Sequence, residues 1–276
     1  MHIGATSQVV EGITLGSGAL SPLNQKSSHP HGLGSPTVST IAPATVASNL
    51  GGVVTPVNIF NLQCALHSHP DRVFVNKLCL ELREGARIGY SGPRQFRFSR
   101  NLPTASLNPE VVTSNLAEEV AKGRTAGPFP SPPFQNFQVS PIGLVPKKHS
   151  DKFRTIFHLS FPKSGTTSIN HFIDKDDFSL QYITIDKAIS AIQRFGSDCF
   201  MAKTDIESAF RLFPVHPHDW ELLGMFWNGS YYFDKVLPFG LRSAPLFSIS
   251  FLTQWSGYCK TTVQSPLYVT SWMTSL

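Results

Sequence analysis

Short helix-like and strand-like segments follow one another along the chain in no regular order, and this order constrains the fold most. Spacing and capping signals predict helices over residues 72–82, 108–122 and 185–195. Short apolar runs next to turn residues predict strands over 138–145, 153–159, 199–205, 223–227 and 231–234. Because no strand–helix–strand rhythm is present, the expected fold class is α+β.

Turn and cap residues set several boundaries. Gly85 is expected to end the helix over 72–82, and Asn108 is expected to cap a helix that has Pro109 at its first position. The polar segment 147–152 lies between two strand-like runs and predicts a hairpin with a basic tip. Asn228-Gly229 predicts a second, tighter hairpin.

Two segments lack the pattern of regular structure. Between Met1 and Val57 only Glu11 and Lys26 carry a side-chain charge, and no apolar period persists, so this part is expected to be a disordered leader or a flank without function. Residues 127–134 are too rich in proline for regular structure and predict a linker or wrapping arm.

Composition excludes several classes of protein. Only 15% of residues are charged, and 21 Pro and 20 Gly argue against a coiled coil, a helical repeat or a collagen-like chain. No apolar stretch predicts a membrane span and no basic-then-apolar N-terminus predicts secretion. The four cysteines form no CxxC pair. We therefore expect an intracellular protein, cytoplasmic or nuclear, that does not associate with membranes.

Basic residues are candidates for contact with an anionic partner. The net charge of +5 and the pI of about 9.1 are compatible with nucleic acid, although many basic proteins bind none. One run interleaves basic and aromatic residues, namely Arg87, Tyr90, Arg94, Phe96, Arg97, Phe98 and Arg100. Such a run can hold a phosphate backbone and stack bases, or it can be a solvated loop over a small aromatic cluster.

Histidines and one aspartate are candidates for metal chemistry. Two groups have suitable spacing for ligands, Cys64 with His67 and His69, and His216 with His218, but surface or turn roles are favoured for both. Asp205 ends an apolar strand, which is where metal-assisted phosphoryl transfer places a carboxylate. A single strand-end aspartate is weak support, because such residues commonly cap turns.

Four sequence strings occur in the order found in reverse transcriptases. They are residues 140–148, 152–154, 203–210 and 237–245. The chain most resembles the DIRS-like, tyrosine-recombinase retrotransposon branch, which also has strings similar to residues 100–103 and 214–217. The resemblance covers about residues 66–247 and implies a polymerase of fingers and palm that copies an RNA or DNA template-primer with deoxynucleoside triphosphates.

The resemblance also implies a role for particular residues. Asp205 resembles the aspartate that binds both catalytic Mg²⁺ ions, with the carbonyl of Ile206 as a second ligand. Phe210 resembles the aromatic gate beneath the incoming sugar, which favours deoxynucleotides. Four further residues resemble nucleotide-binding positions: Lys147 and Arg154 on the triphosphate, and Phe239 and Gly240 in the turn before the motif B helix. Taken singly, the alternatives are a core Phe, a solvated hairpin and an ordinary turn.

The implied organisation has five parts. They are a disordered leader over 1–57, a helical N-terminal extension over 58–126, a fingers-like region over 127–197, a partial palm with motifs A and B over 198–248, and a tail over 249–276.

The family's motif C, with two adjacent aspartates, is missing from the tail. Trp272-Met273-Thr274 must be encoded by TGGATGAC, and a shifted frame of this string reads GAT-GAC, which encodes Asp-Asp. We therefore expect a frameshift between about Ser248 and Gln254. The expected function is a reverse transcriptase domain fragment, inactive as this chain, and whether the chain is an enzyme stays open. The alternatives are a non-catalytic nucleic-acid-binding remnant and a degenerate product without function.

Overall fold

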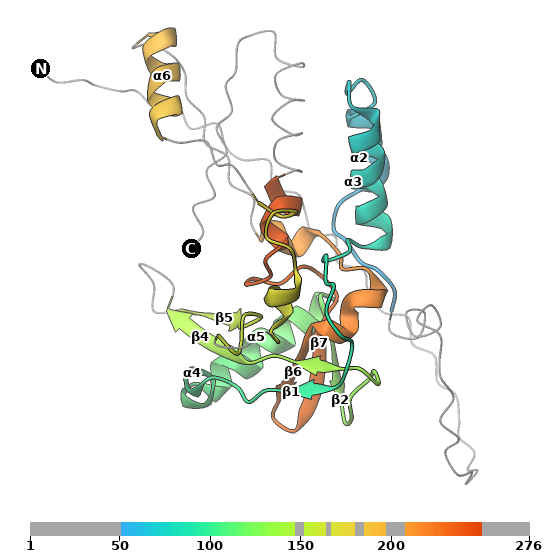
Figure 1. The fold of residues 1–276 in the computed structure, drawn as a ribbon, viewed down its shortest axis with the longest axis vertical. Coiled ribbons are helices and arrows are strands. Elements are labelled where there is room, and N and C mark those ends of the chain that lie inside the picture. The colour runs from blue at the N-terminus through green and yellow to red at the C-terminus, as the bar shows by residue number, and fades with distance from the viewer. Residues whose placement is uncertain (1–50, 147–151, 164–166, 180–184, 197–207, 250–276) are drawn as a thin grey trace, which may run out of the picture. The chain divides into compact units, whose positions relative to one another are not determined.

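The computed structural model confirms the α+β class. It describes residues 51–146, 152–163, 167–179, 185–196 and 208–249, all of which lie in one compact unit, Ile41–Leu276 (Figure 1). The elements are α2 (Ile59–Ala65), α3 (Arg72–Glu84), β1 (Arg97–Phe98), α4 (Pro103–Leu107), α5 (Pro109–Ala121), β2 (Thr125–Phe129), β3 (Gln138–Val139), β4 (Ile142–Pro146), β5 (Phe153–Phe157), η1 (Ile169–Phe172), α6 (Ile185–Phe195), η2 (Ala209–Leu212), η3 (Pro217–Leu222), β6 (Gly224–Trp227) and β7 (Ser230–Asp234). The strand expected over 199–205 lies outside the described residues.

Helix α3 confirms the prediction over 72–82 and ends at Gly85 as expected. The Oδ1 atom of Asp71 accepts a 2.9 Å hydrogen bond from the amide of Phe74 and caps the N-terminus. Gly85 has a φ of 95°, and a Cβ there would lie 2.4 Å from the amide nitrogen of His216. The C-terminal boundary of this helix therefore needs glycine for both its conformation and its close backbone contact.

Helix α5 confirms the prediction over 108–122, but Asn108 does not cap it with its side chain. The Nδ2 group of Asn108 donates instead to the carbonyl of Thr104 at 3.4 Å. The reason is that Asn108 also ends α4, a short helix that the sequence did not predict, so its side chain bonds back to the preceding turn. Pro109 occupies the first turn of α5 as expected.

A five-stranded sheet has the order β1-β3-β6-β7-β2. The strands β1, β3 and β6 are parallel neighbours, whereas β7 is antiparallel to both β6 and β2. The hairpin predicted from Asn228-Gly229 is confirmed by β6 and β7, and both turn residues have positive φ, 46° and 78°. These angles are those of the tight turn that matches the twist of paired strands.

The first part of the proline-rich segment is a strand, which corrects the expectation of a linker over 127–134. Strand β2 includes Gly127 and Pro128 and pairs with β7, with a register shift between Ala126 and Phe129. Because β2 is an edge strand, Pro128 is tolerated at this irregularity.

A separate two-stranded antiparallel sheet confirms the predicted hairpin on either side of segment 147–152. The single strand expected over 138–145 is wrong, because this range is divided between β3 of the five-stranded sheet and β4 of the hairpin. Strands β4 and β5 pair from Ile142 with Phe157 to Pro146 with Phe153. Residues 147–151 of the turn lie outside the described residues. At the other end of the described chain, Val53 and Val57 pack on the core and Thr55 donates to the carbonyl of Leu212 at 2.7 Å, so packed chain extends N-terminal of residue 58.

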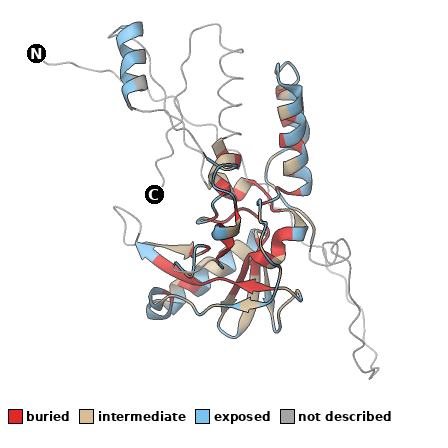
Figure 2. Cartoon of the chain, viewed as in Figure 1, coloured by how far each residue is buried: buried red, intermediate tan, exposed pale blue. Residues whose placement is uncertain are grey.

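Figure 2 shows buried residues concentrated in and around the five-stranded sheet. Trp220, Phe137, Phe213 and Phe233 are the largest fully buried side chains. In β6, Met225 is buried, while Phe226 and Trp227 are only half-buried. No helix among the described residues is long and apolar enough to cross a membrane.

A buried arginine joins four elements. Arg211 in η2 is 8% exposed and donates to Asp234 in β7 at 2.8 and 3.0 Å and to Glu119 in α5 at 2.6 and 3.0 Å. Thr125 in β2 donates to the same Asp234 at 2.6 Å. Burial alone would lower the pKa of Arg211, but the charges of Asp234 and Glu119 outweigh burial and raise it. The guanidinium therefore stays charged and fixes η2 against the sheet and α5.

Replacing Arg211 with Ala should lower the free energy of unfolding by about 3–5 kcal/mol, because it leaves the carboxylate of Asp234 buried without its cation. Urea unfolding followed by circular dichroism measures this loss. The matched control is Arg124→Ala. The partner of Arg124 is Glu119, which is 3.6 Å away and more exposed than Asp234, so the loss in the free energy of unfolding should stay below about 1 kcal/mol. Equal losses in the two variants would contradict the argument.

Candidate functional site

Three residues from distant segments meet at one place. The guanidinium carbon of Arg154 in β5 lies 5.4 Å from the ring centroid of Phe239, and the ring of Phe210 in η2 lies 5.0 Å from the same ring, edge to face. All three side chains are half-buried. One face of the Arg154 group is therefore covered by an aromatic ring, an arrangement that is itself favourable.

The turn after Phe239 is held by a residue that the sequence pattern did not indicate. Asn170, which is buried, donates from Nδ2 to the carbonyl of Gly240 at 2.7 Å and to Ser160 at 2.8 Å, and its Oδ1 accepts from the amide of Arg242 at 2.8 Å. Arg242 in turn donates to the carbonyl of Ile173 at 2.8 Å. No local pattern around Asn170 predicts this role, because its partners in the turn lie some 70 residues away.

Position 240 requires glycine because of its backbone conformation and its close packing. Its φ is 92°, and a Cβ at this position would lie 2.4 Å from the carbonyl oxygen of Phe157 at the end of β5. The turn and β5 therefore approach each other closely, which brings Phe239 next to Arg154. This placement unites four of the residues singled out in the sequence, namely Arg154, Phe210, Phe239 and Gly240.

The remaining predicted site residues, Lys147, Asp205 and Ile206, lie outside the described residues. Within the part of the chain that the structure describes, no group of three or more His, Cys, Asp or Glu side chains could hold a metal ion. In the second histidine pair, Nδ1 of His216 accepts from the amide of His218 at 3.2 Å and so stabilises the start of η3.

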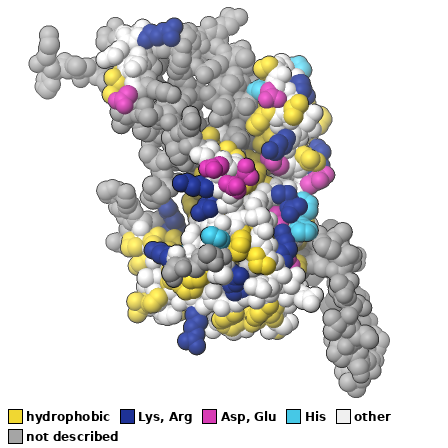
Figure 3. Space-filling model, in the orientation of Figure 1, with side chains coloured by type: hydrophobic (Ala, Val, Ile, Leu, Met, Phe, Trp, Pro, Cys, Tyr) yellow, Lys and Arg dark blue, Asp and Glu magenta, His cyan; other side chains and the backbone are white. Residues whose placement is uncertain are grey.

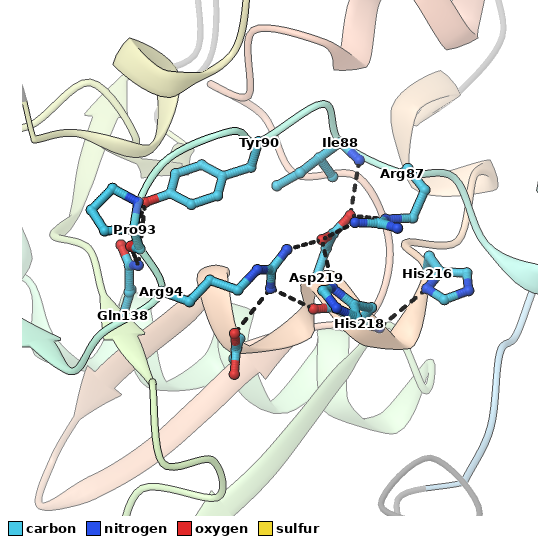
Figure 4. A network of polar contacts seen from close by, with 10 residues as sticks. Arg87, Ile88, Tyr90, Pro93, Arg94, Gln138, His216, His218 and Asp219 are labelled. Carbon is cyan, nitrogen blue, oxygen red and sulfur yellow. Dashed lines mark hydrogen bonds and ion pairs between the residues drawn. The ribbon is translucent and has the colours of Figure 1, made fainter. Parts of the chain in front are cut away.

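Two arginines of the basic and aromatic run, Arg87 and Arg94, form ion pairs within the protein, a role that neither of the two sequence interpretations of this run included (Figure 4). Asp219, 1% exposed, accepts from Arg87 at 2.8 Å, from Arg94 at 2.6 Å and from the amide of Ile88 at 3.1 Å. Arg94 also pairs with Glu221 at 2.9 Å. Burial alone would raise the pKa of Asp219, but these hydrogen bonds outweigh burial and lower it.

The arrangement at Phe239 can bind an anion that has both a flat and a charged part. The face of the Arg154 guanidinium lies against Phe239, so the N–H edges of the group point away from that ring. Among the described residues, no carboxylate forms an ion pair with Arg154. A positive charge and partly exposed aromatic rings therefore occur together at this position.

Comparisons with known proteins give structural likeness only. No protein-family model and no curated protein matches the chain. Three solved structures similar to it are protease-reverse transcriptases of foamy viruses. A mutant of the prototype foamy virus protein shares 17% identity, with a TM-score of 0.39, over 60% of this chain and 19% of its own. The foamy viral protein in complex with double-stranded DNA shares 13% sequence identity, with a TM-score of 0.41. The match covers 72% of this chain and 35% of that protein. The native prototype foamy virus protein shares 15% sequence identity, with a TM-score of 0.41. The match covers 79% of this chain and 28% of that protein. The chain thus spans about a third or less of these proteins.

The Asp219 network predicts how stability depends on pH. The pKa of Asp219 is lower in the folded than in the unfolded protein. The contribution of the Asp219 carboxylate to the free energy of unfolding is therefore complete above the unfolded pKa of about 4, and it is lost as the pH falls through the lower folded pKa. Urea unfolding between pH 7 and pH 2.5 should therefore show a loss of stability below about pH 4. In Asp219→Asn the protein should be less stable at pH 7 and lose less on acidification. An equal acid loss in both proteins would argue against this assignment.

Proposed function

We propose that this chain is a reverse transcriptase domain fragment of the DIRS-like retrotransposon type. Its ancestral reaction is RNA-directed DNA synthesis by two-metal phosphoryl transfer. One observation carries the proposal: the contacts of Phe239 with Arg154 and Phe210 join residues from three of the four strings that carry the family resemblance. These strings are separated by tens of residues in sequence, so a chance resemblance gives no reason for them to meet.

The proposed ligand is a deoxynucleoside triphosphate. Arg154 and Lys147 bind the triphosphate, the former by a bidentate contact and the latter as a point charge. Phe210 lies beneath the sugar and excludes a 2′-hydroxyl, and its position next to Arg211 ties it to the buried ion network. Gly240 lets the backbone approach the nucleotide that pairs with the template.

The proposed metal ligands are incomplete. Asp205 and the carbonyl of Ile206 supply hard oxygen atoms that suit Mg²⁺. No adjacent aspartates follow Pro245 in this sequence, so two of three carboxylates of the family's metal site have no counterpart. This feature favours the second candidate function, a non-catalytic nucleic-acid-binding remnant, for the chain as it stands.

The nucleotide site is tested by direct binding. Arg154→Ala should weaken binding of a Mg²⁺-loaded deoxynucleoside triphosphate about tenfold or more in isothermal titration calorimetry, because a charge-assisted hydrogen bond contributes about 1.5–3 kcal/mol. Arg154→Lys should recover part of the affinity. Arg83→Ala, an exposed arginine of α3, is the matched control and should bind as the parent does. A parent chain without triphosphate affinity would overturn the proposed site.

Primer extension by a chain in which the shifted reading frame is restored tests the proposed ancestral polymerase activity. The 276-residue chain should not extend a primer with Mg²⁺, because it lacks the carboxylates that neutralise charge between two metal ions. A chain continued in the shifted frame from about Ser248 should extend it, and Asp205→Asn should abolish that extension. Asp177→Asn, in the exposed pair Asp176-Asp177, is the control that should keep activity. Extension that survives Asp205→Asn would contradict the proposal.

A further inference from the structure

The outer edge of strand β4, away from β5, is bonded by a segment that is not a strand. The amide of Ile142 donates to Oδ1 of Asn101 at 3.1 Å, and the carbonyl of Ile142 accepts from the amide of Leu102 at 3.0 Å. The amide of Leu144 donates to the hydroxyl oxygen of Thr104 at 3.0 Å. Side-chain oxygens of residues 101–104, which we call the edge segment, thus accept where the carbonyls of a neighbouring strand would accept.

Gly143 shows how closely the edge segment approaches β4. A Cβ at this position would lie 2.7 Å from Cδ1 of Leu102 and 3.0 Å from the hydroxyl oxygen of Thr104. A larger residue would therefore push the edge segment away from the strand. Helix α4 packs on β4, and in Figure 3 hydrophobic side chains cover the region where these two elements lie. The close packing supports the same contact independently of the hydrogen bonds.

The edge segment also joins the hairpin to the larger sheet. The Nδ2 group of Asn101 donates to the carbonyl of Phe226 in β6 at 2.8 Å, so the two ends of one amide side chain bond β6 and β4. On the other strand of the hairpin, Nδ2 of Asn115 in α5 donates to the hydroxyl oxygen of Thr155 at 3.0 Å. Both strands are therefore held from outside the hairpin.

These contacts lie next to the arginine of the candidate site. In the register of the hairpin, Arg154 pairs with Val145, the residue after Leu144. Leu144 is only 2% exposed, so water does not reach its amide to replace the hydroxyl of Thr104. A buried amide without an acceptor is unfavourable, and β4 must shift to relieve it. Because Arg154 is one register position away, its guanidinium would shift as well.

We propose that Asn101 and Thr104 are positioning residues for triphosphate binding, which act by holding the β4–β5 hairpin so that Arg154 stays against Phe239. The role rests on the proposed function, in which Arg154 binds the triphosphate and neither positioning residue touches it. The 5.4 Å contact of Arg154 with Phe239 joins a hairpin strand to a turn, so its geometry depends on what holds the hairpin. A binding group that is already in place loses less entropy on binding, and its displacement therefore weakens affinity.

Isothermal titration calorimetry of the 276-residue chain with Mg²⁺-loaded dTTP tests this role. Thr104→Val keeps the shape of the side chain and removes the hydroxyl, so it should weaken binding about threefold or more, the effect of one lost hydrogen bond. Thr104→Ser keeps the hydroxyl and should bind as the parent does. Asn101→Ala should also weaken binding, because it removes the bonds to both β4 and β6.

The matched control is Thr113→Val in α5. The hydroxyl of Thr113 bonds Trp227 of β6 at 2.9 Å and the carbonyl of Pro109 at 2.8 Å rather than the hairpin, so its loss should leave triphosphate affinity unchanged. Hydrogen exchange measures the hold on the hairpin directly. Thr104→Val should speed exchange over residues 142–146 and 153–157, whereas Thr104→Ser and Thr113→Val should not.

Two results overturn the inference alone. One is a parent that binds triphosphate and a Thr104→Val variant that binds it equally well, since the placement of Arg154 then does not depend on the hydroxyl. The other is an equal loss of affinity in Thr104→Val and Thr113→Val, which indicates a general loss of stability. A parent that binds no triphosphate is a different result, because it overturns the proposed nucleotide site together with this inference.

Discussion

The buried guanidinium of Arg211 is the constraint on which the rest of the described structure depends. Arg211 lies in η2, beside Phe210. Its partner Asp234 belongs to β7 of the sheet, and its partner Glu119 belongs to α5. A charge of this kind is stabilising only when its hydrogen bonds are satisfied, so the three segments must meet in one geometry. The position of Phe210 against Phe239 follows from that geometry, because Phe210 directly precedes Arg211, whose position is fixed by its ion pairs. The ion network therefore belongs to the site as well as to the core.

The arginines of residues 87–100 show that residue type does not decide role. Arg87 and Arg94 have partners in η3, more than 120 residues later, whereas Arg97 and Arg100 face no carboxylate among the described residues. Nothing in the local sequence separates the two pairs, since all four occur in the same run of aromatic and basic residues. The separation comes from Asp219, whose buried carboxylate needs two cations and an amide to stay ionised. Arginines that have an ion-pair partner in the described chain can thus be distinguished from those that have none only after the chain has folded.

Features encoded by neighbouring residues were predicted well from the sequence. The turn at Asn228-Gly229 and the pairing of β4 with β5 each depend on contacts within one hairpin. The end of α3 was predicted because Gly85 readily adopts the positive φ found there, although its close contact with His216 was not predicted. Features that depend on distant partners were not predicted, such as the hydrogen bonds of Asn170 to the turn at Gly240. Strand β2 was missed because its pairing with β7 outweighs the unfavourable preference of its Gly-Pro sequence. The family resemblance named Arg154, Phe210, Phe239 and Gly240, but only the structure shows how they touch.

The contacts that build this site lie within one part of the described chain. Phe239 meets Arg154 and Phe210, and Asn170 holds Gly240 and Arg242, so each of these contacts joins residues between 154 and 242. The metal ligands that the family resemblance implies are a different set, of which Asp205 is the one present. Without the other carboxylates of that implied set, the charge that would hold a second Mg²⁺ is missing, but the contacts of the Arg154 group involve none of them. In the proposed function, nucleotide binding by the Arg154 group is therefore separable from phosphoryl transfer at the metal site.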